Sequence, residues 1–367
     1  MMLMINASNL YVGGGMQVGM SVIEEFTLMD LDFIAAVSPP IYSQLTESAK
    51  KKCLIIKKTP SGLFNFSSRK LLNKMVQEYN IDAVFTVFGP SYWTPKVKNH
   101  TVGFALPWLI YNSSQVFKKL TLIQKVKKII LKYLQPYYYR LNATKIVVET
   151  NDVKEHLYSK LGFEMNKVFV VSNSVSSYFT RDYVLDEKII ERLPKKIAGD
   201  IWLLTVSYNY PHKNLSVIFD LLELLPNHYK FVLTLEKSFI EGLSEEKKSR
   251  FILVGNVENK QCPALYSYSD AVLLPTLLEC FSASYIEAGI MRKPIFTSNR
   301  GFSKTICGEG AFYFNPLDPK DMATTITAAF EKPDQIISKC NLMFDVHKKL
   351  PDAKQRAEMY LKIISEK

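Results

Sequence analysis

Hydrophobic and polar residues follow two different patterns along the chain. Short runs of mostly aliphatic residues, bounded by polar or turn residues, are typical of buried parallel strands. Segments with apolar residues three and four positions apart are typical of amphipathic helices. The runs predict strands at 3–8, 33–38, 53–58, 83–90, 101–107, 145–150, 167–175, 201–207, 231–235, 251–255, 271–275 and 295–297. The periodic segments predict helices at 16–26, 71–79, 116–141 (helical up to Pro136), 151–162, 214–225, 264–269, 282–291 and 351–365.

The order of these elements predicts the fold class. Strands and helices alternate throughout, which favours parallel, doubly wound sheets. A chain of 367 residues exceeds one comfortable core, and a polar stretch of mixed charge at 176–200 reads as a linker. We therefore predict two Rossmann-like α/β domains facing a cleft, the N-terminal one at 1–175 and the C-terminal one at 201–348. The remainder, 349–367, is predicted as a helix, for which packing back on the N-terminal domain is one option.

Composition narrows the class of protein. With 47% hydrophobic and 22% charged residues, the chain is neither disordered nor fibrous. Its five cysteines are scattered without zinc-ligand spacing, which favours free thiols in a reducing compartment. The sequence shows neither a secretory signal pattern nor an apolar stretch of the roughly 20 residues that a membrane span needs. These features predict a cytoplasmic protein without a resident metal.

Positive charge is concentrated in one part of the chain. The formal net charge is +11, and between Ala83 and Glu149 the first acidic residue is Glu149 itself. That interval contains Lys96, Lys98, Lys118, Lys119, Lys125, Lys127, Lys128, Lys132, Arg140 and Lys145. Within it, the 116–141 segment combines lysines with apolar residues at helical spacing, which suits an anionic membrane surface or an anionic lipid acceptor. A plain solvated face remains an alternative; nucleic acid would also be attracted, but no nucleic-acid-binding motif accompanies the charge.

The segment 271–298 is the most informative for function. Its pattern predicts a strand, a loop with Glu279, a helix starting near Ser282 that carries Glu287, and a second strand. Ligands of parallel sheets gather at the carboxyl ends of strands, and the first N–H groups of a helix attract anions such as phosphate. Two carboxylates beside an anion site fit hydroxyl groups, which donate hydrogen bonds to them. Phosphate together with hydroxyls suggests a nucleotide sugar.

A loop of the same half offers a cation. Lys213 lies in Tyr-Pro-His-Lys-Asn, between a predicted strand and helix, where an ammonium group can reach a phosphate. His212 beside it has no partner pattern for a metal. Near the N-terminus, Gly13-Gly14-Gly15 lets backbone approach a ligand, but it is only part of a dinucleotide fingerprint. A dinucleotide site there is a weaker interpretation, and a structural tight turn is another.

These motifs together resemble glycosyltransferase family 4, retaining enzymes of the GT-B architecture. The stretch from Glu279 to Glu287 is similar to the family's E-x7-E pattern, and 210–214 is similar to its Lys-Asn loop. The family's segment before the linker is similar to residues 170–175. Its N-terminal glycine loop is similar to residues 13–18. The amino-acid sequence at 5–18 and 210–214 is similar to that of bacterial O-antigen and capsule sugar transferases.

The resemblance implies roles for individual residues. Lys213 would bind the diphosphate, Glu279 the hydroxyls of the transferred sugar and Glu287 the ribose hydroxyls. The residues implied on the donor side also include Phe281, Ser282, Ala283, Tyr208, Asn214, Gly255 and Val257. Those implied on the acceptor side of the cleft are Gly14, Gly15, Pro107, Trp108 and Asn173.

The sequence also departs from the family pattern at several places. Tyr208 stands where the family usually has an arginine, Cys280 and Ser282 replace glycines, and 106–108 lacks the usual histidine. We predict a metal-independent retaining glycosyltransferase, using a UDP- or GDP-sugar and a lipid-linked oligosaccharide acceptor in cell-surface polysaccharide synthesis. It would lie peripherally at the inner face of the cell membrane, with no nucleic acid as partner. The alternative is a catalytically quiet subunit that binds a glycan or nucleotide.

Overall fold

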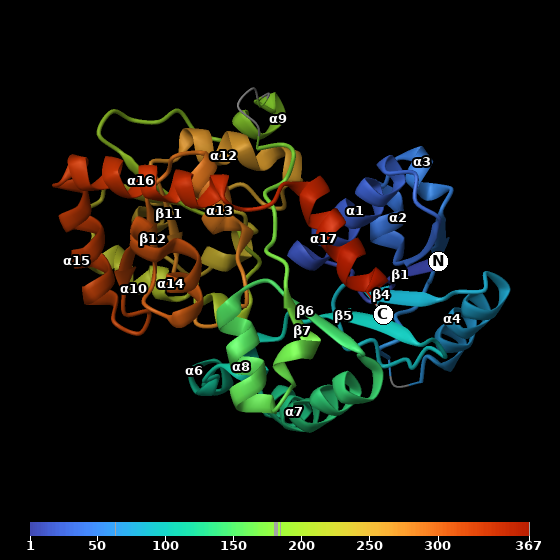
Figure 1. The fold of residues 1–367 in the computed structure, drawn as a ribbon. Coiled ribbons are helices and arrows are strands. Elements are labelled where there is room, and N and C mark those ends of the chain that lie inside the picture. The colour runs from blue at the N-terminus through green and yellow to red at the C-terminus, as the bar shows by residue number, and fades with distance from the viewer. Residues whose placement is uncertain (63, 180–182, 184, 367) are drawn as a thin grey trace. The chain divides into compact units, whose positions relative to one another are not determined.

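The computed structural model describes residues 1–62, 64–179, 183 and 185–366, and it divides into two compact units (Figure 1). The first unit consists of residues 1–111, 121–174 and 351–367, and the second of residues 112–120 and 175–350. Each unit is built around its own parallel sheet.

The sheet of the first unit has seven strands in the order β3-β2-β1-β4-β5-β6-β7, and every pair is parallel. The strands are β1 (Leu3–Ala7), β2 (Phe33–Val37), β3 (Cys53–Ile55), β4 (Ala83–Thr86), β5 (Asn99–Gly103), β6 (Lys145–Val148) and β7 (Val168–Val170). The helices are α1 (Gly13–Leu28), α2 (Pro39–Gln44), α3 (Glu47–Lys50), α4 (Phe66–Glu78), α5 (Pro107–Ile110), α7 (Leu122–Asn142), α8 (Asn151–Leu161) and α17 (Ala353–Ser365).

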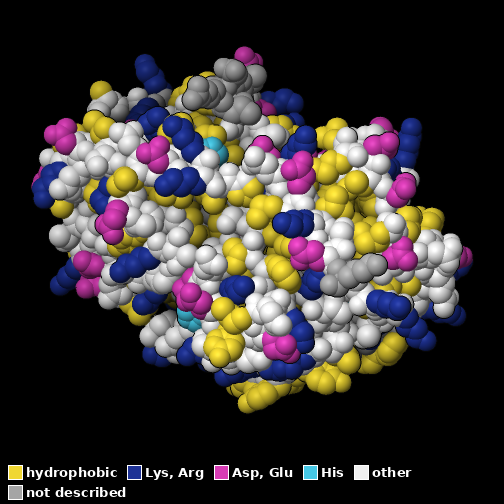
Figure 2. All heavy atoms as spheres, in the orientation of Figure 1, with side chains coloured by type: hydrophobic (Ala, Val, Ile, Leu, Met, Phe, Trp, Pro, Cys, Tyr) yellow, Lys and Arg dark blue, Asp and Glu magenta, His cyan; other side chains and the backbone are white. Residues whose placement is uncertain are grey.

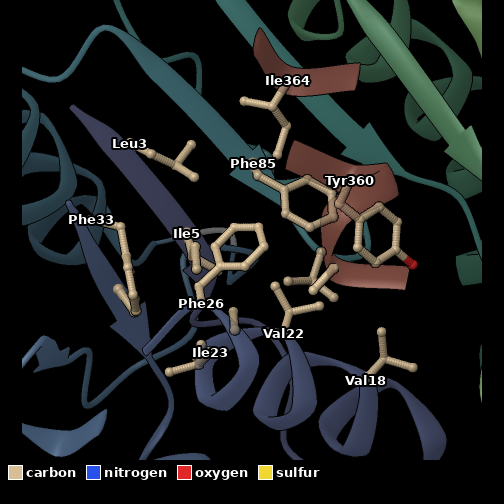
Figure 3. Close-up of a cluster of buried hydrophobic side chains, with 14 of the residues drawn as sticks. Leu3, Ile5, Val18, Val22, Ile23, Phe26, Phe33, Phe85, Tyr360 and Ile364 are labelled. Carbon is tan, nitrogen blue, oxygen red and sulfur yellow. The ribbon is translucent and has the colours of Figure 1, made fainter. Parts of the chain in front are cut away.

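Both faces of this sheet are buried, which explains why its strands read as continuous apolar runs. In β1, Leu3 and Ile5 belong to a core cluster on one face, while Met4 belongs to a separate cluster on the other. Figure 3 shows the first cluster, where α1 and α17 bring side chains onto β1 and β4. The rings of Phe85 and Tyr360 lie there with centroids 4.9 Å apart.

The second unit repeats this construction with six parallel strands in the order β10-β9-β8-β11-β12-β13. The strands are β8 (Ile201–Thr205), β9 (Tyr229–Leu233), β10 (Phe251–Leu253), β11 (Ala271–Leu274), β12 (Ile295–Ser298) and β13 (Phe312–Phe314). The helices are α6 (Ser114–Lys118), α9 (Glu187–Ile190), α10 (Val217–Leu224), α11 (Glu245–Lys248), α12 (Cys262–Tyr268), α13 (Ala283–Ile290), α14 (Gly301–Cys307), α15 (Pro319–Phe330) and α16 (Pro333–Lys348). The predicted pair of doubly wound α/β units is therefore confirmed.

The predicted helix at 116–141 is wrong in two respects. The chain forms two helices, α6 and α7, and α7 continues through Pro136 to Asn142. Pro136 is tolerated because α7 buries a short face against its own unit, where the Tyr139 hydroxyl donates to the Gly103 carbonyl at 3.0 Å and Gln135 donates to the Tyr92 hydroxyl at 2.8 Å. Tertiary packing here outweighs the helix-breaking tendency of proline.

The predicted linker contains more structure than its sequence suggests, whereas the helix predicted at 351–365 is confirmed by α17. Residues 180–182 and 184 of the predicted linker lie outside the described residues, whereas Ile189 of α9 is buried in the core of the second unit. Helix α17 belongs to the first unit, where the guanidinium of Arg356 donates hydrogen bonds to Asn173 and Ser21.

Over the described ranges 1–62, 64–179, 183 and 185–366, no helix is both long and apolar enough to cross a membrane.

We predict that Gly103→Ala destabilises the first unit. A Cβ atom at this position would lie 1.8 Å from the carbonyl oxygen of Val87, so the β5 backbone or the 87–89 turn must move. Such overpacking costs about 3 kcal/mol in the free energy of unfolding, measurable by urea denaturation. Gly14→Ala is the matched control, since nothing lies within 4 Å of its built Cβ. Equal stability of both variants would contradict the packing of this turn.

Candidate functional site

The predicted strand–loop–helix–strand unit at 271–298 is confirmed. Strand β11 pairs in parallel with β12, and the loop between β11 and α13 leads into the first turn of α13. Gly289 lies in this helix because a Cβ there would come within 2.9 Å of the Met343 carbonyl of α16. Arg292, with a φ of 51°, adopts the left-handed conformation just after the helix and turns the chain toward β12.

Lys213 and Glu279 form an ion pair at this edge of the sheet. The Lys213 ammonium donates to Glu279 Oε1 at 2.6 Å, although the two residues are 66 positions apart. Their side chains are 19% and 12% exposed, so the pair is largely shielded from water. The carboxylate of Glu279 precedes α13, whose first N–H groups also favour negative charge. The structure thus brings together two of the residues that the sequence predicts as the centre of the site.

Two backbone-directed hydrogen bonds tie the loops that carry this pair. The carbonyl oxygen of His212 accepts from the Leu277 amide at 2.7 Å and from the Thr276 hydroxyl at 3.1 Å. Lys213 follows in the 3₁₀ turn Pro211–Lys213, just after β8 and before α10. Because both loops leave the carboxyl ends of adjacent parallel strands, their side chains converge at a single edge.

Glu287 lies in the same unit but in a different environment. It is 8% exposed, and the hydroxyl of the fully buried Tyr266 donates to its Oε2 atom at 2.7 Å. Burial raises the pKa of the Glu287 carboxyl to about 7, while the Tyr266 hydrogen bond acts in the opposite direction. A buried carboxyl with a raised pKa is costly to keep ionised, and such groups gather at functional sites.

The other residues predicted on the donor side lie in the second unit. Ser282 precedes α13 as its N-cap residue and Ala283 opens the helix, while Phe281 packs against the core beneath them. Tyr208 is 46% exposed, and its ring lies 5.8 Å from that of Tyr210.

The second unit also contains the remaining predicted donor-side residues, Asn214, Gly255 and Val257. Asn214 adopts the left-handed conformation at φ 58°, and its side-chain amide donates to the Pro316 carbonyl at 2.9 Å. Gly255, at φ 68°, follows β10, and Val257 packs against the core.

The residues predicted on the acceptor side lie in the first unit. Gly14 and Gly15 are in the first turn of α1, and Pro107 and Trp108 open the short helix α5. The Lys128 ammonium lies 4.2 Å from the centroid of the Trp108 ring, a cation–π contact. Asn173 accepts a hydrogen bond from Arg356 and a second one, at 2.9 Å, from the Ser174 amide.

Sequence reasoning missed three neighbours of the site. Tyr266 gives no signal in the sequence, because it reads as one more apolar position of α12. His212 was considered only as a metal ligand, yet its Nε2 atom lies 4.0 Å from Glu279 Oε2. Lys119, in the short segment 112–120 that packs with the second unit, donates to Asn214 and, at 3.3 Å, to the Ser216 hydroxyl. In the sequence, Lys119 counts only as one of the lysines of the basic interval, which is interpreted as surface charge.

The chain is similar to several glycosyltransferases. Residues 187–341, which include Lys213, Glu279 and Glu287, match the family model of glycosyl transferases group 1. The chain is also 21% identical over 217 residues to the O-antigen chain mannosyltransferase RfbU of Salmonella typhimurium; the alignment covers 56% of this chain and 58% of the relative.

Solved structures share the fold over its whole length. The glycosyltransferase WaaG, involved in lipopolysaccharide biosynthesis, has a TM-score of 0.75 at 12% identity and covers 100% of both chains. HepE of Anabaena, in complex with UDP and glucose, has a TM-score of 0.72 at 12% identity and covers 100% of this chain and 99% of its own. The fold is therefore that of the GT-B glycosyltransferases.

We predict that Glu287→Gln makes the second unit more stable at neutral and higher pH. Since the folded-state pKa of about 7 lies above the reference value of 4.5, the folded protein binds the proton more tightly. The contribution of Glu287 to the free energy of unfolding therefore falls as the pH rises from 4.5 to about 7, whereas the amide of the variant stays neutral. The free energy of unfolding of the variant should exceed that of the wild type by about 3 kcal/mol at about pH 8, and by little near pH 4.5.

Urea unfolding across this pH range measures the effect. Glu246→Gln, at an exposed position of α11, is the control and should follow the wild-type curve. Parallel pH profiles for wild type and Glu287→Gln would show that the Glu287 carboxyl is not buried as described.

Proposed function

We propose that this protein is a retaining glycosyltransferase that moves a sugar from a nucleoside-diphosphate sugar to a lipid-linked glycan. The observation that carries the proposal is the Lys213–Glu279 ion pair at the start of α13. A lysine ammonium and a helix N-terminus supply positive potential for a diphosphate, and the nearby carboxylates suit hydroxyl groups. HepE, of the same fold, has been crystallised with UDP-glucose, which supports a nucleotide sugar as donor.

The proposed chemistry rests on stabilising the departing nucleoside diphosphate. Negative charge develops on the bridging oxygen as the bond from the sugar to the phosphate breaks, and the Lys213 ammonium would neutralise it. In the structure this ammonium is paired with Glu279, so a bound diphosphate would take the place of the carboxylate. Glu279 would then turn to the hydroxyls of the transferred sugar, and Glu287 would accept hydrogen bonds from the ribose. These charges motivate the proposal that transfer needs no metal ion.

Retention of configuration is the finer part of the proposal. It would follow from substitution on the same face of the sugar, with the departing phosphate taking the proton of the acceptor hydroxyl. The anomeric configuration of the product decides this point directly. The relatives RfbU and WaaG, named for O-antigen and lipopolysaccharide synthesis, motivate a cell-surface glycan as acceptor.

We predict that Lys213→Ala lowers the rate of sugar transfer by about 100-fold, the typical cost of removing one group that stabilises transition-state charge. The measurement is release of UDP or GDP from a panel of donor sugars by the purified protein in the presence of a lipid-linked glycan acceptor. Lys195→Ala, at an exposed lysine of the same unit, should leave the rate unchanged. Wild-type rates in Lys213→Ala would refute the proposed site, and wild-type protein inactive with every donor would favour a catalytically quiet binding subunit.

A second part of the proposal concerns helix α7 and the cytoplasmic membrane surface. One side of α7 exposes large apolar side chains, including Ile123 (82%), Ile130 (57%) and Tyr133 (74%). Lysines accompany them, and Figure 2 shows hydrophobic and basic side chains gathered along the lower edge, where Figure 1 has α7. An exposed apolar stripe flanked by lysines suits the headgroup region of an anionic bilayer, where a lipid-linked acceptor would be found.

We predict that Ile123→Glu combined with Ile130→Glu weakens binding to vesicles with anionic lipids by at least about tenfold. The reason is that two apolar side chains no longer enter the bilayer and two negative charges oppose it. Co-sedimentation with vesicles measures the effect. Leu28→Glu, at a residue of α1 that is 78% exposed, is the matched control and should bind as wild type does. Equal binding of all three proteins would remove α7 as a membrane contact.

A further inference from the structure

Glu279 is flanked by two side chains that can carry positive charge. The Lys213 ammonium lies 2.6 Å from Glu279 Oε1, and the His212 Nε2 atom lies 4.0 Å from Glu279 Oε2. The two oxygens of one carboxylate therefore face two different nitrogen groups of the same short turn. An anion in the place of this carboxylate would meet both of them.

The imidazole ring of His212 is held in this orientation from two sides. Its backbone carbonyl accepts from Leu277 and Thr276, which fixes the turn to the loop before α13. Its ring stacks on Tyr210, with centroids 5.5 Å apart and an angle of 11° between the planes. The His212 side chain is 33% exposed, so part of the ring borders solvent. A ring held this way loses little conformational freedom when it binds a ligand.

We propose that His212 is a second diphosphate-binding residue, which grips the phosphate oxygens together with Lys213 when the donor displaces Glu279. The inference rests on the proposed function and names a further residue of the same site. A nucleoside diphosphate carries more than one negative charge, which the Lys213 ammonium alone does not balance. An imidazolium ring adds a second charge and a charge-assisted hydrogen bond.

The charged and titratable groups around the ring decide how it responds to pH. Among the described residues they include Glu279 across the site, Lys213 on the same turn and Tyr210, which is stacked on the ring and in turn contacts Tyr208. Imidazole side chains change charge between about pH 5 and 8. A contribution that depends on the imidazolium charge should be present in mildly acidic solution and lost in alkaline solution.

The test compares wild type, His212→Gln and His212→Arg by calorimetric titration with UDP and with GDP at about pH 6 and about pH 8.5. The glutamine keeps a hydrogen-bond donor without the charge, and the arginine keeps a charge at both pH values. Glu287 and the phosphate groups of the ligand also titrate in this range. They are common to all three proteins, so the ratio of dissociation constants at one pH isolates His212.

We expect His212→Gln to bind the nucleotide roughly tenfold more weakly than wild type at the lower pH and nearly equally at the higher pH. His212→Arg should bind more tightly than wild type at the higher pH. A ratio for His212→Gln that stays near one, or one that is the same at both pH values, would overturn the role of His212. If wild type bound neither UDP nor GDP, the proposed function itself would fall; binding that Lys213→Ala weakens and His212→Gln does not would overturn the inference alone.

Discussion

The ion pair between Lys213 and Glu279 is the contact around which the candidate site is organised. It joins two loops that leave the carboxyl ends of the adjacent strands β8 and β11. Hydrogen bonds from Leu277 and Thr276 to the His212 carbonyl hold the same two loops together through the backbone. A lysine, a carboxylate and the start of α13 are thereby held at one edge of the sheet. In the structure the Glu279 carboxylate lies before the start of α13, a position that suits an anion.

The environment of Glu287 indicates that this site is kept at a cost to stability. Its burial raises the pKa of the carboxyl to about 7, so at neutral pH the fold contains a carboxyl that resists ionisation. The Tyr266 hydroxyl, through a 2.7 Å hydrogen bond, favours the ionised form. An apolar residue in this position would suit the surrounding core better. Buried acids with a raised pKa are typical of functional sites, which agrees with the proposed role of Glu287.

The sequence predicts the fold well because the strands are buried on both faces. Continuous runs such as 3–8 and 271–275 leave little ambiguity, and the unit containing Glu279 and Glu287 follows from the same pattern. Helix α7 was predicted wrongly beyond Pro136, since the contacts of Tyr139 and Gln135 that stabilise its last turns come from distant residues. The partnership of Tyr266 with Glu287 and the approach of His212 to Glu279 also depend on tertiary structure. Such contacts join residues far apart in the sequence, so the local hydrophobic pattern does not predict them.

The central claim is that Lys213, Glu279 and Glu287 serve a single nucleoside diphosphate. Crystal structures of the full chain with UDP and with GDP test it most directly. The account predicts that one of these nucleotides binds at the start of α13, with the diphosphate within hydrogen-bonding distance of the Lys213 ammonium and the ribose hydroxyls facing Glu287. A nucleotide bound elsewhere on the chain, with the Lys213–Glu279 ion pair unchanged, would contradict it.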